Sequence, residues 1–269
     1  MSTTIAPPPP GPRTSARVIA ILAIALGAVL VAGALVTGVF STARAATQRT
    51  ETLTADARGI RSLDVDVAAA DLEIVYGGEE ATLTVTGNVA DWRLVRDGDG
   101  LAVTTHRGWW GSWRPFGDSD RAVLTLPQSL ERAGLDADLS LAAGSLRAGG
   151  AFGDLDLDLS AGAMDVSGSA RALETDVSAG RLVFDLADVR DADLQLSAGA
   201  ANGTLTGSAP QTVAIDVSAG RLDLTLPDVP YAVGSDVSAG ELRNDLDVDA
   251  RSDRRVSVSV SAGFVALGS

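Results

Sequence analysis

One short phrase returns along most of this chain at intervals close to 20 residues. It reads LAAG at its first appearance and SAG afterwards, and successive copies are separated by 18, 18, 19, 21, 20 and 23 residues. The glycines that end the copies are Gly144, Gly162, Gly180, Gly199, Gly220, Gly240 and Gly263. Repetition at such a period indicates a solenoid, in which each copy forms one coil that buries its apolar side only against neighbouring coils.

Apolar and polar residues alternate on both sides of each repeated glycine. In one copy the apolar positions are Leu155, Leu157 and Leu159 before the glycine, and Met164 and Val166 after it. A period of two is typical of a β-strand with one buried face. The parity changes at the glycine. This predicts a corner where the glycine and its successor leave the core, with the preceding alanine inside the corner and a positive φ at the glycine.

A further copy without the glycine lies near the start of the repetitive region. Residues 63–69 alternate, Ala70 stands in the glycine position, and Leu72 and Ile74 resume the alternation. With this copy included, the sequence predicts an all-β fold, a single-stranded parallel β-solenoid of about eight coils of 18–23 residues over residues 61–269. At roughly 4.8 Å between neighbouring strands, the stack would be about 40 Å long.

The repeat is interrupted between Ala70 and Gly144 by segments of a different kind. Residues 81–88, 92–106 and 121–127 alternate as strands, and the DGDG sequence inside the second of them predicts a hairpin turn. We expect these strands to extend the first coils as partly antiparallel edges.

A tryptophan-rich insert, residues 107–120, separates the last two of these strands. In a chain with only 4% aromatic residues, it carries the side chains Trp109, Trp110, Trp113 and Phe116, between Arg107 and Arg114. Two interpretations stay open. The insert can cap the open end of the solenoid, or it can be a binding site that stacks on sugars, enters a membrane interface or anchors a partner protein.

The N-terminal region predicts a membrane anchor. Residues 1–17 are a proline-rich head expected to be disordered and cytoplasmic, and residues 41–60 are expected to be a polar linker. Between them, Val18–Phe40 is a run of 23 uncharged residues, long enough to cross the lipid bilayer as a helix. The ARA sequence at Ala43–Ala45 resembles a cleavage site, so a removed signal peptide stays an alternative. We expect a single-pass protein of the cell membrane whose C-terminal domain is extracytoplasmic.

The composition excludes several classes of function. With 35 acidic and 21 basic residues the net charge is −14, which disfavours nucleic acid as a partner. The chain has no cysteine and a single histidine, His106, so we expect no thiol chemistry, metal site or cofactor. The alternating Asp154, Asp156 and Asp158 do not match the calcium-binding nonapeptide repeat. A polysaccharide-cleaving β-helix is the enzyme alternative, but we expect a protein that is not an enzyme.

The repeated phrase also resembles a known family. The sequences DVSAGRL at 176–182 and 216–222 and DVSAGEL at 236–242, with the early LTVTG strand and the DGDGLAV hairpin, resemble the bacterial DUF4097 family of predicted adhesins. The resemblance covers about residues 58–269. It implies a surface-exposed envelope solenoid with no catalytic residues to carry over, and some members resemble components encoded with envelope-stress signalling systems.

Together these observations predict a membrane-anchored, extracytoplasmic β-solenoid that serves as a non-catalytic binding, adhesin-like or scaffolding module of the bacterial cell envelope. The alternative is a regulatory or sensor subunit of an envelope-stress system that acts through a partner membrane protein. A cell-wall glycan or a membrane protein is the expected partner. The final coil ends at Ser269 without an evident cap, so its edge is a candidate for edge-to-edge pairing in a homodimer.

Overall fold

A computed structural model of the chain describes residues 50–105 and 120–269, which belong to one compact unit, Arg49–Ser269. The regular structure in these ranges consists of β-strands and two short 3-10 helices, η1 (Val89–Asp91) and η2 (Gln128–Leu130). Within the same ranges no helix is long and apolar enough to cross a membrane, and the predicted membrane segment, residues 18–40, lies outside them.

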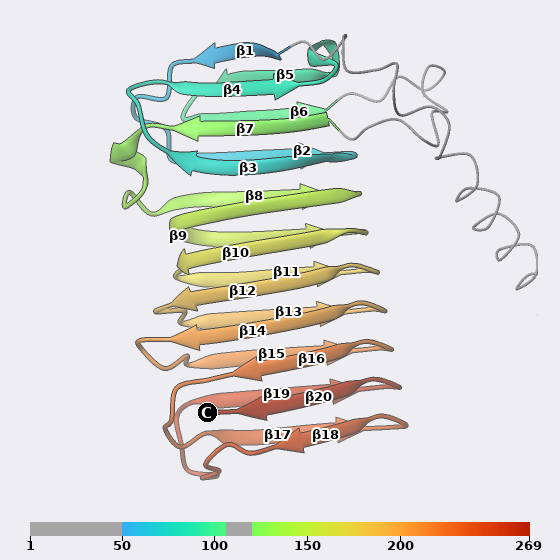
Figure 1. Ribbon diagram of the computed structural model, residues 1–269. Helices are drawn as coiled ribbons and strands as arrows, with labels where there is room; N and C mark the ends of the chain where they lie inside the picture. Colours follow the sequence, from blue (N-terminus) through green and yellow to red (C-terminus); the bar gives the residue numbers. More distant parts are fainter. Residues whose placement is uncertain (1–49, 106–119) are drawn as a thin grey trace, which may run out of the picture. The chain divides into compact units, whose positions relative to one another are not determined.

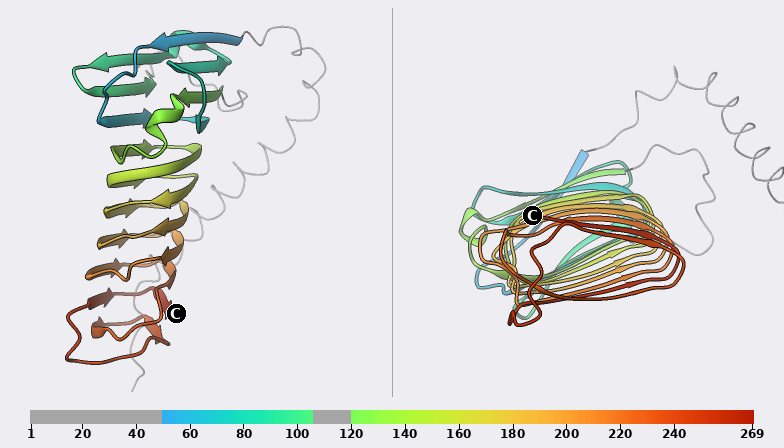
Figure 2. Two further views of the ribbon diagram at one scale, coloured as in Figure 1. Left: turned by 90° about the vertical axis from the view of Figure 1, so that its left-hand side faces the viewer. Right: turned by 90° about the horizontal axis from the view of Figure 1, so that it is seen from below.

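The strands form two facing sheets, and each coil contributes one strand to each sheet (Figure 1). Seen along the column, a coil is a flattened loop whose two long sides are these sheets (Figure 2). Sheet A contains, in spatial order, β1 (Thr50–Ala55), β4 (Ala81–Thr86), β7 (Asp120–Leu126), β3 (Ala70–Tyr76), the first half of β9 (Gly144–Leu159), β10 (Ala163–Ser169), β12 (Arg181–Ala187), β14 (Ala200–Thr206), β16 (Arg221–Thr225), β20 (Phe264–Gly268) and β18 (Glu241–Asn244). Sheet B contains β5 (Trp92–Asp97), β6 (Gly100–Thr105), β2 (Ser62–Val67), β8 (Leu135–Leu141), the second half of β9, β11 (Ala172–Val177), β13 (Asp191–Leu196), β15 (Thr212–Val217), β19 (Arg255–Val260) and β17 (Ala232–Val237).

Most pairings between these strands are parallel, so the predicted parallel β-solenoid is confirmed. The exceptions are β1 with β4, β4 with β7, and β5 with β6, which are antiparallel at the end where the chain enters the solenoid. The hairpin predicted at the DGDG turn is present, with Asp97 opposite Gly100. Strand β1 falls inside residues 41–60, which the sequence predicts to be a linker, so the solenoid begins earlier than expected.

The coils do not stack in the order of the sequence. The described parallel coils are, in space, β6–β7, β2–β3, β8–β9, β9–β10, β11–β12, β13–β14, β15–β16, β19–β20 and β17–β18. The predicted count of eight is one too low because β6–β7, interpreted as part of the interruption, is also a coil. The sequence also predicts that the last coil of the chain forms one end of the column. This prediction is wrong, since β19–β20 lies between β15–β16 and β17–β18.

The polarity of the outermost coil explains this order. Ser235 and Asn244 stand in register with Val258 and Leu267, at positions that face the core in other coils, and both are exposed. A coil with polar residues at core positions loses little when one of its sides faces water. The last coil is apolar at the corresponding positions and is buried from both sides.

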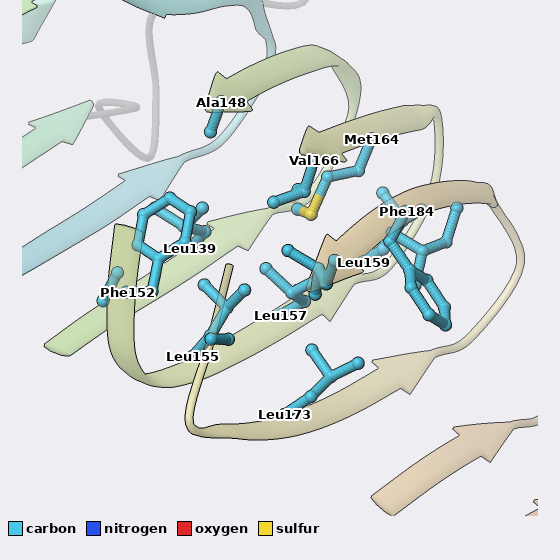
Figure 3. Packing of buried hydrophobic residues seen from close by; sticks show 14 of the residues in the cluster. Leu139, Ala148, Phe152, Leu155, Leu157, Leu159, Met164, Val166, Leu173 and Phe184 are labelled. Atoms are coloured by element: carbon cyan, nitrogen blue, oxygen red, sulfur yellow. The ribbon is translucent and has the colours of Figure 1, made fainter. Parts of the chain in front are cut away.

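The core is a narrow layer of aliphatic side chains between the two sheets. Leu155, Leu157 and Leu159 of β9 point toward Met164 and Val166 of β10 (Figure 3) and are almost completely buried, as the alternation predicts. Burying one such side chain contributes roughly 1.5–3 kcal/mol to the free energy of folding.

The repeated SAG corner differs from the expectation in two details. The two consecutive outward residues are the serine and the alanine, so Ala179 is exposed instead of filling the corner, whereas Gly180 is half-buried and Arg181 after it is exposed. The hydrogen-bond ladder explains why, because it continues through the corner. The backbone N–H of Ala179 donates to the carbonyl of Ser160 at 3.0 Å, and that of Arg181 donates to the carbonyl of Gly162 at 2.9 Å. The corner is therefore a paired part of the stack, and the alanine side chain points outward.

The corner glycines are needed mainly because neighbouring coils approach closely. A positive φ is present at Gly144 (106°) and Gly162 (107°). It is absent at Gly180, Gly199, Gly220, Gly240 and Gly263, where the prediction of a positive φ is wrong. At Gly180 a Cβ atom would lie 2.6 Å from Cδ2 of Leu159, and at Gly199 it would lie 2.4 Å from the carbonyl oxygen of Gly180. Distances this short exclude a side chain unless the stack shifts.

The second corner of each coil, which leads from sheet A back to sheet B, accounts for the uneven period. It spans residues 170–171 after β10, 188–190 after β12 and 207–211 after β14. A buried residue, such as Ala170 or Val189, closes each of these corners. Loops of different length are tolerated here because they lie at the surface, outside the strand ladder.

Candidate functional site

The tryptophan-rich insert occupies the place of one SAG corner. The predicted site residues Trp109, Trp110, Trp113 and Phe116 lie outside the described residues, but the strands on both sides of them are described. Strand β6 ends at Thr105 and β7 begins at Asp120, and these two strands belong to one coil. In the other coils two or three residues connect the corresponding strands, whereas here residues 106–119 do so.

Two hydrogen bonds hold the ends of the insert. At its start, the hydroxyl of Thr105 accepts a hydrogen bond from the backbone N–H of Ala68, at 2.7 Å, in the neighbouring coil. At its end, Oδ1 of Asp120 accepts a hydrogen bond from the backbone N–H of Asn88 at 3.1 Å. The points where the insert leaves and rejoins the solenoid are therefore fixed by the fold.

The chain enters the solenoid at the same end of the column. The first strand, β1, pairs with β4, and β4 pairs with β7, which follows the insert. Thr50, the first described residue, therefore lies two strands from β7 in sheet A. The N-terminal segment and the tryptophan-rich insert both join the solenoid in its first layers.

A second candidate surface is the acidic face, the outward side of sheet B. Parallel register brings carboxylates from successive coils side by side in one row: Asp64, Asp138, Asp156, Glu174 and Asp193. Neighbouring strands are about 4.8 Å apart, so each carboxylate has like charges as its nearest neighbours. A shallow groove of about 710 Å³ runs along this row, with Ala172 and Ala192 among its lining residues.

The crowding of carboxylates changes their titration. Partial burial, followed by the neighbouring carboxylates, raises the pKa of Asp64, Asp156 and Asp158 above the ordinary value for aspartate. Arginine is found at the margin of the acidic face, where Arg171 contacts Asp154 at 2.7 Å and Asp136 at 3.9 Å. These side chains are more than half exposed, so water and salt screen the pairs and they contribute little to stability. The acidic face therefore keeps a strong negative charge.

The alternation of Asp154, Asp156 and Asp158 along one strand does not reveal this face as a site. The close contacts between carboxylates are between strands and follow from the register. The signal was present in the acids that precede most of the SAG phrases, as in LDLDLS and ETDVS. Among residues 50–105 and 120–269, no group of three or more histidine, aspartate or glutamate side chains is placed to hold a metal ion.

Comparisons with known proteins give weak similarities to solved structures. A "putative adhesin" from Bacteroides fragilis is 12% identical with a TM-score of 0.47, and the match covers 82% of this chain and 98% of that one. A "putative adhesin" from Parabacteroides merdae is 13% identical with a TM-score of 0.42, covering 84% of this chain and 98% of that one. A "putative lipid binding protein" from Parabacteroides distasonis is 12% identical with a TM-score of 0.40, covering 82% and 97%.

Comparison with protein-family models finds no match, and comparison with curated protein sequences finds none either. Membership of the DUF4097 family therefore stays a prediction.

Proposed function

We propose that the protein is a membrane-anchored, non-catalytic binding and scaffolding module of the bacterial cell envelope, with residues 18–40 in the bilayer and the solenoid outside it. The observation that carries the proposal is that the N-terminal segment and the tryptophan-rich insert join the same end of the solenoid. Residues 41–49, between the anchor and β1, can span at most about 30 Å. In this proposal, the end of the solenoid that carries the insert is the end that faces the bilayer.

In this arrangement the two ends of the solenoid have different functions. Near the bilayer, Trp109, Trp110 and Trp113 are suited to the membrane–water interface or to a membrane-bound partner, because indole rings combine apolar surface with a polar N–H group. The far end, formed by β17–β18, carries polar residues and lies roughly 40 Å away along the column. Between the ends, repeated rows of outward side chains offer a rigid face on which a partner can contact several coils at once.

The topology is tested with the full-length chain carrying an epitope after Ser269, expressed in a bacterial host. We expect the chain to sediment with membranes and the epitope to be digested by protease added to intact spheroplasts, while a cytoplasmic control protein survives. A variant that lacks residues 18–40 should leave the membrane fraction. An epitope that is protected in intact spheroplasts and digested only after lysis would contradict the proposal.

The role of the insert is tested by replacing Trp109, Trp110 and Trp113 with alanine in one variant. In the full-length chain reconstituted into vesicles, indole fluorescence of the parent should be poorly quenched by acrylamide, and the remaining indole of Trp92 provides the reference signal. Trp92 is buried in β5, so its emission should be the same in both proteins. Strong quenching in the parent, unchanged by vesicles or by cell-wall glycans, would show that the insert is neither at the interface nor a glycan site. Crosslinking that recovers one fixed membrane protein would favour the sensor-subunit alternative.

A further inference from the structure

The outward charge on the middle of the acidic face has one sign only. Its strands follow one another along the column in the order β2, β8, the second half of β9, β11, β13 and β15 (Figure 1). No arginine points outward from these strands, and each strand carries exposed acids: Asp64, Asp66, Asp136, Asp138, Asp154, Asp156, Asp158, Glu174, Asp176, Asp191, Asp193 and Asp216.

The outward side of sheet A, in the same coils, has a different character. There arginines are mixed with the acids. Arg147 stands opposite Asp165 in register, and Arg221 pairs with Asp223 of its own strand at 2.7 Å. An acid excess that only kept the protein soluble would be expected on both sheets. Its concentration on sheet B therefore points to a partner of opposite charge.

One arginine of the chain shows how a cation fits this face. At the margin, Nη2 of Arg171 lies 2.7 Å from Asp154 and 3.9 Å from Asp136, so a single guanidinium group bridges carboxylates of two successive coils. Two residues further along both strands, Asp138 stands directly opposite Asp156. The face therefore repeats, away from its margin, the arrangement of carboxylates that Arg171 bridges.

These inner carboxylates have no such partner within the described part of the chain. They form the inner row: Asp64, Asp138, Asp156, Glu174 and Asp193. None of the ion pairs between described residues includes a member of the inner row. The inner row is thus accessible to the cationic groups of another molecule.

The geometry favours guanidinium or ammonium groups over a metal ion. In the ranges 50–105 and 120–269, no cluster of three or more histidine, aspartate or glutamate side chains is placed to hold a metal. A guanidinium group binds carboxylate oxygens side by side and needs no closed cage of ligands. The shallow groove of about 710 Å³ along the row has the small outward side chains Ala172 and Ala214 in its lining, which leaves room for a peptide backbone.

The length of the groove matches a short extended peptide. From β2 to β15 it extends about 24 Å, which about eight extended residues span. In an extended segment alternate side chains point to the same side, so basic residues at every second position would all face the inner row. Each ion pair is weak on an exposed surface, but several made at once by one peptide reinforce each other.

We propose that the acidic face docks an extended segment of a partner protein in which arginine or lysine occupies alternate positions. The proposal rests on the proposed function, because a binding module outside the membrane meets the basic segments of other envelope proteins there. It deepens that function by naming the class of partner that one face of the solenoid takes.

The test is fluorescence anisotropy of labelled peptides titrated with the full-length protein in a neutral detergent. The probe is an eight-residue peptide of alternating arginine and threonine, and its matched control has glutamine in place of arginine. We expect the arginine peptide to bind and the glutamine peptide not to bind. Binding should weaken as sodium chloride rises from about 0.1 M to about 0.5 M, because salt screens exposed charges.

Two triple variants with the same change of net charge separate docking on this face from a general attraction to an acidic protein. The first removes three charges from the inner row: Asp138→Asn, Asp156→Asn and Glu174→Gln. The second removes three charges from exposed outward positions of sheet A: Glu73→Gln, Asp165→Asn and Asp185→Asn. Affinity for the arginine peptide should fall about tenfold in the first variant, because three weak ion pairs are lost together, and less than about twofold in the second.

Folding is checked on the same variants by urea unfolding. The first variant should unfold at the same or a higher urea concentration than the parent, because it removes like charges that are neighbours. If it unfolds at a lower concentration, Glu174→Gln alone replaces it. This single exposed substitution should weaken peptide binding about twofold, and binding equal to that of the parent would overturn the proposal.

Three further results would overturn the proposal. The arginine peptide does not bind, both triple variants weaken its binding equally, or equimolar spermine or calcium displaces it. The last result would make a small cation the occupant of the face. Failure of the proposed function is distinguishable, because it appears in the spheroplast experiment, whereas peptide binding is measured on the isolated protein.

Discussion

Four glycines allow the two structural reasons for glycine, a positive φ and a close approach, to be measured separately. Gly162 combines both, with a φ of 107° and so little space that a Cβ atom would lie only 2.3 Å from the carbonyl oxygen of Gly144. Gly180 has only the close approach, chiefly to the Leu159 side chain and, at 3.0 Å, to the carbonyl oxygen of Gly162. Gly134 has only the positive φ, 69°, with nothing within 4 Å, and Gly234 has neither constraint.

The expected losses of unfolding free energy on substitution with alanine follow from these constraints. A positive φ at a residue other than glycine costs about 1–2 kcal/mol, and overpacking costs about 1–3 kcal/mol. We therefore expect about 3–5 kcal/mol for Gly162→Ala, where rigid backbone meets the new methyl group. Gly180→Ala should lose about 1–3 kcal/mol because the Leu159 side chain can move, Gly134→Ala about 1 kcal/mol, and Gly234→Ala less than about 0.5 kcal/mol.

The assay is equilibrium urea unfolding of the full-length chain in detergent, followed by circular dichroism of the strand signal. Solenoids can unfold coil by coil, so hydrogen exchange of the neighbouring strands provides a local measurement beside the global one. Equal losses for Gly162→Ala and Gly180→Ala would refute the separation of the two effects. A loss above about 1 kcal/mol for Gly234→Ala would show that the outer coil is packed more tightly than the structure indicates.

Two further predictions concern the acidic face and the outer coil. Because the pKa of Asp156 is raised in the folded state, its protonation stabilises the fold below the unfolded pKa, and this contribution is lost as the pH rises through the folded pKa. Asp156→Asn should therefore raise the unfolding free energy at pH 7 by a few tenths to about 1 kcal/mol. This gain should vanish near pH 3, where the aspartate is protonated. A gain in unfolding free energy that persists at pH 3 would contradict the electrostatic explanation. Ser235→Val should make the exposed end of the column more apolar and cause concentration-dependent association, measured by sedimentation velocity. The control Ser257→Val, on the outward side of β19, should not associate. Association of both variants would show that the end of the column is not the cause.

The sequence was sufficient to predict the solenoid because the constraint on a coil is local. Alternation through Leu155, Leu157 and Leu159 identifies an inward face whatever the coil packs against, and the SAG phrase identifies the corner. Even the copy without glycine could be placed, since Ala70 indeed stands in register with Gly144. The same local argument could not give the direction of the corner alanine, because that depends on the ladder formed with the next coil.

The stacking order and the candidate sites are not local properties. Asp64, Asp138 and Asp156 are far apart in the sequence and become neighbours only through register, so alternation along one strand did not reveal the acidic face. The out-of-order final coil did have a signal in the sequence: Ser235 is polar and exposed where the other coils have an aliphatic residue or, in β11, the buried Thr175.

At both ends of the solenoid, the spatial order of the coils affects self-association. At each end a coil that is not terminal in sequence is terminal in space, so β6–β7 covers β2–β3 and β17–β18 covers β19–β20. The candidate edge for a homodimer therefore moves from the coil that ends at Ser269 to β17–β18. There the inward Ser235 and Asn244 reduce the apolar area that a second copy could bury, which is one way in which natural sheets discourage edge pairing.

At the other end, antiparallel β1 and β5 flank the parallel stack, and a second solenoid could not continue the parallel register there. We therefore expect the column to act as a single unit whose partners approach its faces and corners rather than extend it.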